Sequence, residues 1–510
     1  MCTRSARADA RRSRRGRRRA DGPQQRAGRT TAMAFTGNET WAIAYLAMEW
    51  TIRIVMVVVV PLRRTPDAAR SWLLLVFFLP IPALAVYLAI GRPTYPRWRR
   101  ERFARLPEVL AAASKEIAHS HFCRQPELPG PLAGPALLIE TLGRFPALSG
   151  NDVELLSSYD GVIDRMVADI DHAERTVHLL FYIFADDDTG RRVIEALERA
   201  ARRGVACRVL IDAIGSRQWR RQVARLLAQA GVDVRFALKV GIFRRRSARA
   251  DLRNHRKIAV VDSRVGYVGS QNITNALSAS DIANEELVAR VVGPITTELQ
   301  AVFVGDWFME TEEELAVSAL FPHHHPEAGV VAQVLPSGPD YPDAGIGYLV
   351  AALVHGASKR VVITTPYFVP DEPLLQALKT AVLRGVEVRL LVPRLTDHIL
   401  VKLAQQSYYS ELLQAGVQVH LYEGGFLHAK HVTFDDEISL LGSSNVDIRS
   451  FVLNAEVSLI AFDKGVTVQL RSEQMRCLDK SEMLTSEGWE ERPMIHKIGE
   501  NLARLASPLL

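Results

Sequence analysis

One stretch decides the fold: Asn254-His255-Arg256-Lys257-Ile258-Ala259-Val260-Val261-Asp262, which has the form H-x-K-x4-D. Seven residues after its aspartate comes Gly269-Ser270-Gln271-Asn272. The whole arrangement returns as His428-Ala429-Lys430-His431-Val432-Thr433-Phe434-Asp435, again followed seven residues later by Gly442-Ser443-Ser444-Asn445. The two histidines are 173 residues apart. A compound pattern repeated at this distance predicts a duplicated domain whose two copies form one site.

The residues around each motif repeat the same order of elements. Apolar runs at 176–183 and 205–211 flank a helical pattern at 190–203, and runs at 360–365 and 386–392 flank one at 374–383. Continuous apolar strands that alternate with helices favour a parallel-rich sheet covered on both faces. We therefore predict an α/β fold with two tandem halves, at 151–315 and 331–485, joined by a linker at 316–330.

The positive charge of the chain is concentrated in its first residues. The formal net charge is +6, but residues 1–35 alone hold 11 arginines and two aspartates, so acidic residues slightly outnumber basic ones elsewhere. This distribution argues against a nucleic-acid partner, which needs a basic face on the folded domain. The tail is almost without apolar residues and is expected to be disordered. Either the tail binds anionic lipid, or translation starts at Met33 rather than at Met1 and the tail is not part of the protein.

Two apolar segments follow the tail, at 41–62 and 71–90, and we predict that they form a transmembrane hairpin within residues 36–95. The second contains no charge and has the length that spans a hydrocarbon core. Its Pro80 and Pro82 are better tolerated in membrane helices than in soluble ones. The first segment contains Glu49 and Arg53, so a buried soluble helix is the alternative for it.

Arginines precede the first segment and follow the second, which places both flanks and everything downstream of them in the cytoplasm by the positive-inside rule. Arg63, Arg64 and Arg70 lie in the connection and weaken this orientation. The four cysteines form no C-x-x-C pair, which excludes a disulfide framework and a zinc site and agrees with a reducing compartment. The predicted location is the inner cell membrane, with more than one pass.

Three further segments have weaker patterns. Residues 96–150 are predicted to be a linker with some local helix, and residues 486–510 to contain an amphipathic helix. That helix either packs on the domain or touches the membrane. His323-His324-His325 lies between prolines in the central linker and is interpreted as solvated, since no partner ligands for a metal are evident.

The residue types of the two motifs predict phosphoryl transfer without a metal or cofactor. A strand that carries H-x-K directs its histidine and lysine to the same face. Lysine places charge beside a phosphate oxygen, while serine and asparagine add neutral donors. One neutral imidazole attacks phosphorus, and the other, protonated, gives its proton to the leaving alcohol. The predicted catalytic residues are His255, Lys257, Asp262, His428, Lys430 and Asp435, and the predicted phosphate-binding residues are Ser270, Asn272, Ser443 and Asn445.

Two pairs of acidic residues occupy matching positions in the halves. Glu286 follows Asn284-Glu285 and Glu456 follows Asn454-Ala455, and we predict that each orients a ring nitrogen of a histidine. Asp262 and Asp435 each end an apolar strand just before a turn, so a turn-forming role competes with the catalytic one.

The duplicated H-x-K-x4-D with its G-S-x-N resembles the signature of the phospholipase D superfamily, over about residues 150–480. The resemblance implies two α/β halves with one active site at their interface. It also implies that His255 is the nucleophile and His428 the general acid and base, although the residues alone do not order them. The phosphate ligands that it implies are Lys257, Asn272, Lys430 and Asn445.

Narrower features resemble the bacterial cardiolipin synthases of that superfamily. They lie at residues 63–67, 72–75, 91–92, 253–257, 447–456, 489–493 and 505–510. The resemblance implies a phosphatidyltransferase that joins two phosphatidylglycerol molecules through a phosphohistidine and releases glycerol. Its implied partners are phosphatidylglycerol, other anionic phospholipids and the membrane. The sequence departs from the pattern in its Arg-rich tail and in Asp281-Ile282-Ala283-Asn284, where an aromatic-rich stretch is expected.

Three alternative functions are considered. The first is a phospholipase D that hydrolyses another phospholipid or transfers its phosphatidyl group to another alcohol. The second is a nuclease with the same motifs, which the charge distribution and the hairpin disfavour. The third is an inactive membrane scaffold, which two intact motifs disfavour. The basic run 243–246 and Arg249 are interpreted either as headgroup contacts or as a solvated loop. The sequence does not determine the acceptor alcohol or the oligomeric state.

Overall fold

The computed structural model describes residues 37–506, except 65, 92–95, 112–114, 116, 118–119, 129, 241–248, 250, 277–281, 316–328, 342–344 and 397. The Arg-rich tail, the run 243–246, Asp281 and the three consecutive histidines therefore lie outside the described residues. The chain divides into two units, Met1–Thr51 and Ile52–Leu510. Helix α1 (Gly37–Val59) begins in the first unit and ends in the second.

Among the described residues, one helix is long and apolar enough to cross a membrane, at Thr40–Val59. The segment 71–90, which the sequence favours more strongly, is not one helix. It forms α2 (Pro66–Phe78) and α3 (Pro80–Ile90), separated at Leu79, whose φ of −133° and ψ of 67° are not helical. The cause is Pro80, because proline restricts the residue before it to extended conformations.

A small apolar core holds the end of α1 against α2 and α3. Trp72 is fully buried at its centre and meets the ring of Tyr87 edge-on, with the ring centroids 5.1 Å apart. Met56 and Val60 contribute from the end of α1 and Ala83 from α3. In the second unit the end of α1 therefore packs with α2 and α3, and α2 and α3 fold back on each other, so the second apolar segment is a pair of short helices rather than one arm of the predicted hairpin.

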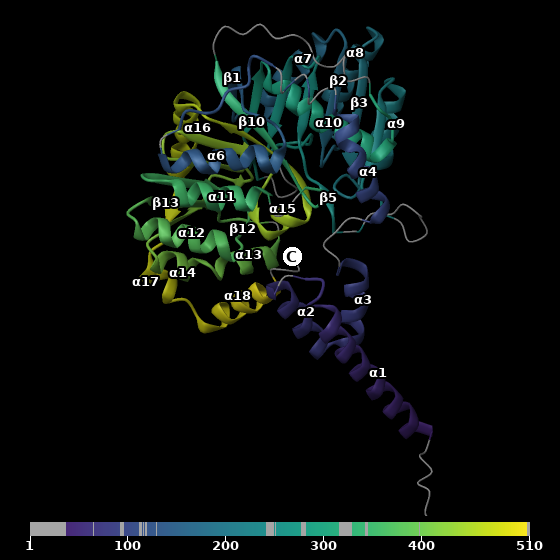
Figure 1. Cartoon of the computed structure of the whole chain (residues 1–510), viewed down its shortest axis with the longest axis vertical. Helices are drawn as coiled ribbons and strands as arrows, with labels where there is room; N and C mark the ends of the chain where they lie inside the picture. Colours follow the sequence, from purple (N-terminus) through teal and green to yellow (C-terminus); the bar gives the residue numbers. More distant parts are fainter. Residues whose placement is uncertain are drawn as a thin grey trace, which may run out of the picture. The chain divides into compact units, whose positions relative to one another are not determined.

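The first half of the catalytic region alternates strands and helices and ends in a buried helix (Figure 1). Its helix α8 begins at the N-cap Asp187, which accepts a hydrogen bond from the Gly190 amide, and it ends before Gly204, whose φ is +91°. The elements are β1 (Leu148–Leu156), α7 (Tyr159–Asp171), β2 (Thr176–Phe181), α8 (Asp188–Arg202), β3 (Ala206–Asp212), α9 (Arg220–Gln229), β4 (Asp233–Ala237), β5 (Arg253–Asn254), β6 (Ile258–Val261), β7 (Val265–Gly269), β8 (Asn284–Glu285), β9 (Val288–Val292) and α10 (Ile295–Thr311).

The second half repeats this order, in green to yellow in Figure 1. Helix α12 begins at the N-cap Asp371 and ends before Gly385, whose φ is +86°. The elements are β10 (Val330–Ser337), α11 (Gly345–Gly356), β11 (Arg360–Thr364), β12 (Phe368–Val369), α12 (Glu372–Leu383), β13 (Glu387–Pro393), α13 (Ile399–Gln406), α14 (Tyr409–Gln414), β14 (Gln418–Tyr422), β15 (Phe426–Leu427), β16 (His431–Phe434), β17 (Ile438–Gly442), β18 (Val446–Asp447), α15 (Ile448–Val452), β19 (Asn454–Ala461), α16 (Lys464–Leu478) and β20 (Ser481–Met483).

The two halves share one sheet. Its order is β20-β14-β13-β11-β16-β17-β19-β10-β1-β9-β7-β6-β2-β3-β4, so β1 and β10 join the halves. Along this order β2, β3 and β4 and their counterparts β11, β13 and β14 pair in parallel, whereas β6, β7, β16 and β17 pair antiparallel. The two-residue strand β5 joins the same sheet beside it, in parallel with β19. The sheet is therefore mixed rather than parallel-rich. The short hairpins β6-β7 and β16-β17 explain the difference, because closely spaced strands can only return antiparallel.

Both faces of the sheet are covered, as the apolar strands predict. In β2, Val177 and Leu179 pack in the core formed with α7 and α8, while Leu180 packs in the core that includes α10. Fifteen of the seventeen residues of α10 are buried, which makes it the central helix of the first half. This packing holds the motif strands rigidly from behind.

The predicted linker at 96–150 is part of the folded region. It contains α4 (Arg97–Val109) and α6 (Gly130–Gly143), and Leu132 and Ile139 of α6 lie in the core of the second half. In α4, Arg99 is 2% exposed and bonds Glu310 at 2.6 Å, while Arg102 donates to the Met309 carbonyl. These two arginines bind the protein body, so they no longer support the orientation argued from positive flanks.

The C-terminal segment contains α17 (Ser486–Glu490) and α18 (Met494–Ala506). One side of α18 packs on the second half, next to α13, through Ala503 and Glu500. The amphipathic helix predicted there is present and does pack on the domain. Its other side is described below.

Candidate active site

The first histidine is placed by a short ladder that crosses between the halves. Strand β5 pairs in parallel with β19 of the second half, with Arg253 opposite Asn454 and Asn254 opposite Ala455. The next amide, that of His255, donates to the Ala455 carbonyl at 2.8 Å. This ladder brings the first motif beside Glu456, which is two residues beyond Asn454 in the other half.

The second histidine is placed by the reciprocal ladder. Strand β15 pairs in parallel with β8 of the first half, with Leu427 opposite Glu285. The His428 amide then donates to the Glu285 carbonyl at 2.8 Å. The second motif is thereby brought beside Glu286. Two short crossed ladders, rather than the large sheet, bring the motifs of the two halves together.

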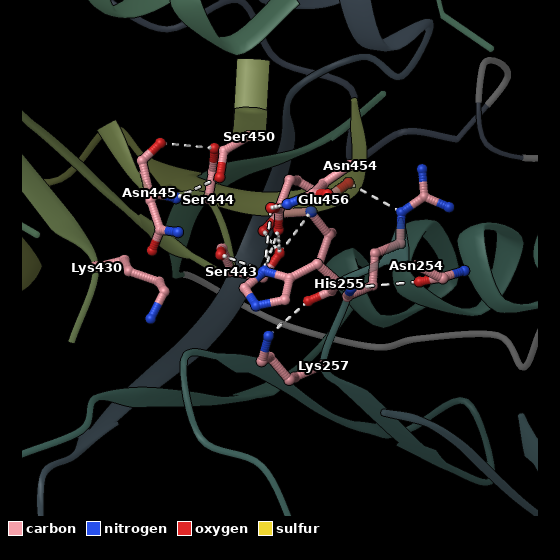
Figure 2. A network of polar contacts seen from close by, with 12 residues as sticks. Asn254, His255, Lys257, Lys430, Ser443, Ser444, Asn445, Ser450, Asn454 and Glu456 are labelled. Atoms are coloured by element: carbon pink, nitrogen blue, oxygen red, sulfur yellow. Dashed lines mark hydrogen bonds and ion pairs between the residues drawn. The ribbon is translucent and has the colours of Figure 1, made fainter. Parts of the chain in front are cut away.

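Each histidine ring is bound by the glutamate of the opposite half. His255 Nδ1 lies 3.0 Å from both carboxylate oxygens of Glu456 and 3.2 Å from the Ser443 carbonyl oxygen (Figure 2). His428 Nδ1 lies 2.7 Å from Glu286 Oε1. Since both partners accept, Nδ1 carries the proton in each ring, and Nε2 is left as the reactive nitrogen.

The two lysines lie within the same electrostatic cluster. Lys257 Nζ donates to the His255 carbonyl at 2.7 Å, and Lys430 Nζ donates to the His428 carbonyl at 2.5 Å. Burial lowers the pKa of Lys257 to about 7, Glu456 opposes this, and the charge of Lys430 lowers it further (Figure 2). Two buried cations that repel each other form a site that an anion would stabilise.

Burial also controls the protonation of the dyads. It lowers the pKa of His255 to about 4 and lowers the pKa of His428, in both cases against the raising effect of the partner glutamate. Burial alone would raise the pKa of Glu286 and of Glu456, but the neighbouring histidine and lysine outweigh it and lower both. Without substrate the site thus holds ionised glutamates beside neutral imidazoles.

The predicted phosphate-binding serines face elsewhere. Ser443 Oγ bonds the Glu456 carboxylate and accepts from the Val457 amide at 3.0 Å. Ser270 Oγ donates to the Leu287 carbonyl at 3.2 Å and accepts from the Leu287 amide at 3.0 Å. Both serines are fully buried. Their hydroxyls are therefore occupied by the strands that carry the glutamates, so a direct contact with phosphate is not supported by their position.

The predicted asparagines remain at the site with part of their amides engaged. Asn272 Oδ1 accepts from the Ile183 amide at 3.1 Å, which leaves its Nδ2 as the donor group. Asn445 Nδ2 lies 3.2 Å from Asp447 Oδ2, and Figure 2 shows this side chain in the same cluster as Lys430. Asn272 and Asn445 are 7% and 6% exposed.

The predicted catalytic aspartates lie at the far ends of the motif strands. Asp262 accepts hydrogen bonds from the amides of residues 174, 175 and 176, and Asp435 accepts from those of residues 358, 359 and 360. Asp262 lies five positions after Lys257, at the other end of strand β6, which is about 16 Å of extended chain. Both aspartates have φ of +51°. Their positions support the turn-forming alternative rather than the catalytic one.

Three groups around His255 were not singled out from the sequence. Arg256 lies in the connection between β5 and β6, where its buried guanidinium bonds Asp306 at 2.5 Å. A charged residue beside two buried apolar strands signals that an oppositely charged partner is needed, although it does not identify that partner. The ring of Tyr182 lies edge-on to His255, with the centroids 4.8 Å apart. Asp212 is fully buried and accepts from the Asn254 amide at 2.9 Å.

Among the described residues, no group of three or more histidine, cysteine, aspartate or glutamate side chains is arranged to hold a metal ion. The chemistry available to the site comes from two imidazoles, two carboxylates and two amines. Together they can bind a phosphodiester, supply a neutral nucleophile and move one proton.

Comparisons with known proteins agree with this arrangement. A family model described as "Cardiolipin synthase, PLD-like domain" matches residues 166–307 and 350–477, which contain both motifs. Cardiolipin synthase A of Yersinia pseudotuberculosis serotype O:1b (strain IP 31758) is 36% identical over 472 residues, covering 90% of this chain and 95% of that protein. Cardiolipin synthase A of Yersinia pestis gives the same values.

A solved structure supports the fold independently. The phosphatidylserine synthase of Haemophilus influenzae Rd KW20 superposes with a TM-score of 0.57 at 14% sequence identity, covering 74% of this chain and 99% of that chain. At this identity the likeness concerns the fold alone.

Proposed function

The chain belongs to the cardiolipin synthases of the phospholipase D superfamily, and from this membership we propose that His255 and His428 carry a phosphatidyl transfer between two phosphatidylglycerol molecules. Membership makes the chain a phospholipid phosphatidyltransferase. The observation that carries the assignment of residues is the reciprocal pairing of each histidine with the glutamate of the opposite half. It gives one site two imidazoles with the same tautomer.

In the first step, Nε2 of His255 attacks the phosphorus of one phosphatidylglycerol. The P–O bond to the glycerol headgroup breaks, and a protonated His428 gives its Nε2 proton to the leaving oxygen. The phosphatidyl group is then bonded to His255. The low pKa of His255, about 4, supports its role as the neutral nucleophile. The bound phosphate would raise the pKa of His428, because an anion favours the charged imidazole.

In the second step, a glycerol hydroxyl of another phosphatidylglycerol attacks the phosphohistidine. His428 accepts the hydroxyl proton, the P–N bond breaks, and cardiolipin leaves with His255 restored. Lys257 and Lys430 stabilise the charge on the phosphoryl oxygens in both steps, assisted by the side-chain amides of Asn272 and Asn445. Water in place of the lipid alcohol would give phosphatidic acid instead.

The remaining predicted residues act through these groups. Ser443 and Ser270 hold the strands of Glu456 and Glu286 and so position the glutamates. Asp262 and Asp435 close the turns that fix the far ends of the motif strands. We therefore assign these four residues to positioning and stability rather than to contact with phosphate.

The product distribution tests this function. Purified full-length protein is incubated in mixed micelles with phosphatidylglycerol labelled in the glycerol headgroup or in an acyl chain. Cardiolipin and free glycerol in equal amounts are expected. Phosphatidic acid as the main product would show a hydrolase, and DNA cleavage without lipid turnover would show a nuclease.

We also propose that α1 crosses the membrane and that the catalytic region lies in the cytoplasm. Helices α2 and α3 fold back on each other, with the ring of Trp72 against that of Tyr87, so the segment Pro66–Ile90 does not extend across a hydrocarbon core of about 30 Å as one helix. The Leu79 amide still donates to Leu75 and the Ala83 amide to Leu79, so the backbone stays paired across the bend.

Reporter fusions test the topology. Insertions at residue 63 and at residue 151 are both expected to be active with a cytoplasmic reporter and inactive with a periplasmic one, whereas an insertion at residue 35 should give the reverse. A periplasmic reporter active at residue 63 would show that α2 and α3 cross the membrane.

A further inference from the structure

A large cavity lies against the outer side of α18, away from the paired histidines. Its volume is about 1080 Å³, and it is bounded by Arg64, Ala68, Arg70 and Ser71 at the hairpin connection, by Tyr348, and by the start of α12, α15 and α18. All these elements belong to the unit Ile52–Leu510. We call this cavity the α18 groove. It exceeds the range of about 300–1000 Å³ that small-molecule sites occupy.

The outer side of α18 gives the groove an apolar wall. Met494, Ile498, Leu502 and Leu505 line it at helical spacing, and they are 49–68% exposed. The inner side is different, because Ala503 packs in the core and is only 6% exposed. A helix buried on one side and widely apolar on the other is typical of a surface that contacts lipid.

The basic side chains in the groove outnumber the acidic ones. Arg64 and Arg70 come from the hairpin connection and Lys497 and Arg504 from α18, against the two carboxylates Asp371 and Glu372. Asp371 is occupied as the N-cap of α12. This balance favours an anionic ligand over a neutral or cationic one.

Arg64 has a hydrogen-bond donor that could bind such a ligand. Its Nε is buried, and no hydrogen-bond partner for it exists among the described residues. The guanidinium lies 5.7 Å from the ring centroid of Trp72, and burial and the charge of Arg249 lower its pKa. A buried guanidinium nitrogen without a partner is costly, and a phosphate oxygen would satisfy both its charge and its donor.

We propose that the α18 groove binds one anionic diacyl phospholipid drawn from the bilayer, with its acyl chains on the outer side of α18 and its phosphate beside Arg64. The hairpin connection supplies the basic groups at one edge, and α18 supplies the apolar wall. This site goes beyond the phosphatidyl transfer, since its lipid is held away from His255 and His428 and is not consumed.

Photolabelling of the full-length protein tests the proposal. The protein is placed in phosphatidylcholine nanodiscs that contain a phosphatidic acid probe with a diazirine in its acyl chain. Phosphatidic acid is anionic but has no headgroup alcohol to lose, so it is not a phosphatidyl donor of the enzyme. The label is expected on the peptide that contains Met494 to Leu505. A phosphatidylcholine probe should label that peptide less.

Variants identify the groups that hold the probe. Ile498→Asp with Leu502→Asp should remove most of the label, while Val468→Asp, on α16 and 53% exposed outside the groove, should leave it unchanged. Arg64→Gln should reduce labelling by the anionic probe about fivefold, the effect of one cation near an anionic lipid, and should leave the phosphatidylcholine probe unaffected. Circular dichroism melts of each variant confirm folding.

Two results would overturn the proposal. One is equal labelling of the α18 peptide and the peptide that contains Val468, which would show general contact with lipid. The other is a loss of α18 labelling in His255→Ala, which would show that the probe is held by the transfer site. If His255→Ala keeps the label on the α18 peptide, the lipid site in the groove is supported, whatever products the transfer assay gives. The groove proposal and the transfer proposal can therefore be refuted independently.

Discussion

The two halves supply the same reactive groups in different surroundings. In the first half Arg256 stands between the histidine and the lysine and bonds Asp306, whereas the second half has the buried Ala429 at that place. Beside His255 lies the edge of Tyr182, whose ring is also 5.4 Å from Lys257 Nζ. The first motif is thus held more tightly by charge than the second.

The surroundings of the second histidine are less polar. Phe426 stacks on His428 with the ring centroids 5.8 Å apart. The carboxylate partner differs too, because Glu456 lies in the continuous strand β19 while Glu286 lies in the break between β8 and β9. The groups that both halves share are those that the proposed transfer requires. The differences between the halves fit the roles proposed for His255 as the nucleophile and for His428 as the proton carrier.

The largest loss of kcat should come from removing either histidine. A substrate whose leaving group needs no proton should distinguish the nucleophile from the proton donor. We expect His255→Ala and His428→Ala each to lower kcat by about 10³-fold or more, because each removes a nucleophile or a proton donor. With a phosphatidyl ester of p-nitrophenol, which leaves without a proton, His428→Ala should recover most of its first turnover and His255→Ala should not. Burst kinetics measure this. Recovery by His255→Ala alone would reverse the assignment.

Neutralising the glutamates should shift opposite limbs of the pH profile. Each carboxylate raises the pKa of its histidine, so Gln lowers that pKa. Since His255 must be neutral, Glu456→Gln should move the acidic limb of the kcat profile to lower pH. Since His428 must be protonated, Glu286→Gln should move the alkaline limb to lower pH. A loss of about 10²-fold in kcat accompanies each change. Movement of the same limb in both variants would contradict separate roles.

Breaking the ion pair found only in the first half should affect stability. Arg256→Met leaves Asp306 without its charged partner, and we expect the free energy of unfolding of the catalytic region to fall by about 3 kcal/mol. Denaturant unfolding monitored by fluorescence measures the change. Arg165→Gln is the control, because its pair with Glu154 is half exposed and should contribute less than about 1 kcal/mol. If both variants lowered the free energy of unfolding equally, the buried Arg256–Asp306 pair would not stabilise the first half more than an exposed ion pair does.

The smallest losses of stability, of about the same size in the two halves, should come from substituting the turn aspartates Asp262 and Asp435. Asp262→Asn and Asp435→Asn each weaken hydrogen bonds from three backbone amides, so each should cost about 1–2 kcal/mol of stability. The kcat of the folded fraction should stay near that of the unchanged protein, measured per active site titrated by the burst. A selective loss of kcat in one variant would restore a catalytic role to that aspartate.

The repeat and the meeting of its two motifs were predictable, because both follow from a duplicated local pattern. The strand alternation expected for H-x-K is not found, since residues 255–257 and 428–430 lie in the connections after β5 and β15. The crossed ladders were not predictable, since β5 and β15 pair with strands about 200 and 140 residues away and have only two residues each. The contacts of Ser443 and Asp262 were not predictable, because a hydroxyl or carboxylate near a motif does not reveal which backbone amides it meets.

The membrane segments illustrate another limit. Composition ranks 71–90 above 41–62, yet the restriction imposed by Pro80 on Leu79 divides the favoured segment. Likewise, the charges of Arg99 and Arg102 suggested a membrane flank, although both are buried against the body. Hydropathy and charge depend on the residue type alone. The break at Leu79 and the burial of Arg99 and Arg102 depend on the neighbouring residues that each one contacts in the fold.

The crossed pairing of His255 with Glu456 has a consequence for biosynthesis. In a growing chain the first motif is made about 200 residues before Glu456, the carboxylate that binds its histidine ring. Until Glu456 is made, nothing fixes the tautomer of His255, and His428 has also only just been added. A nascent chain therefore has no complete site, and activity can begin only when the whole catalytic region has been synthesised and folded.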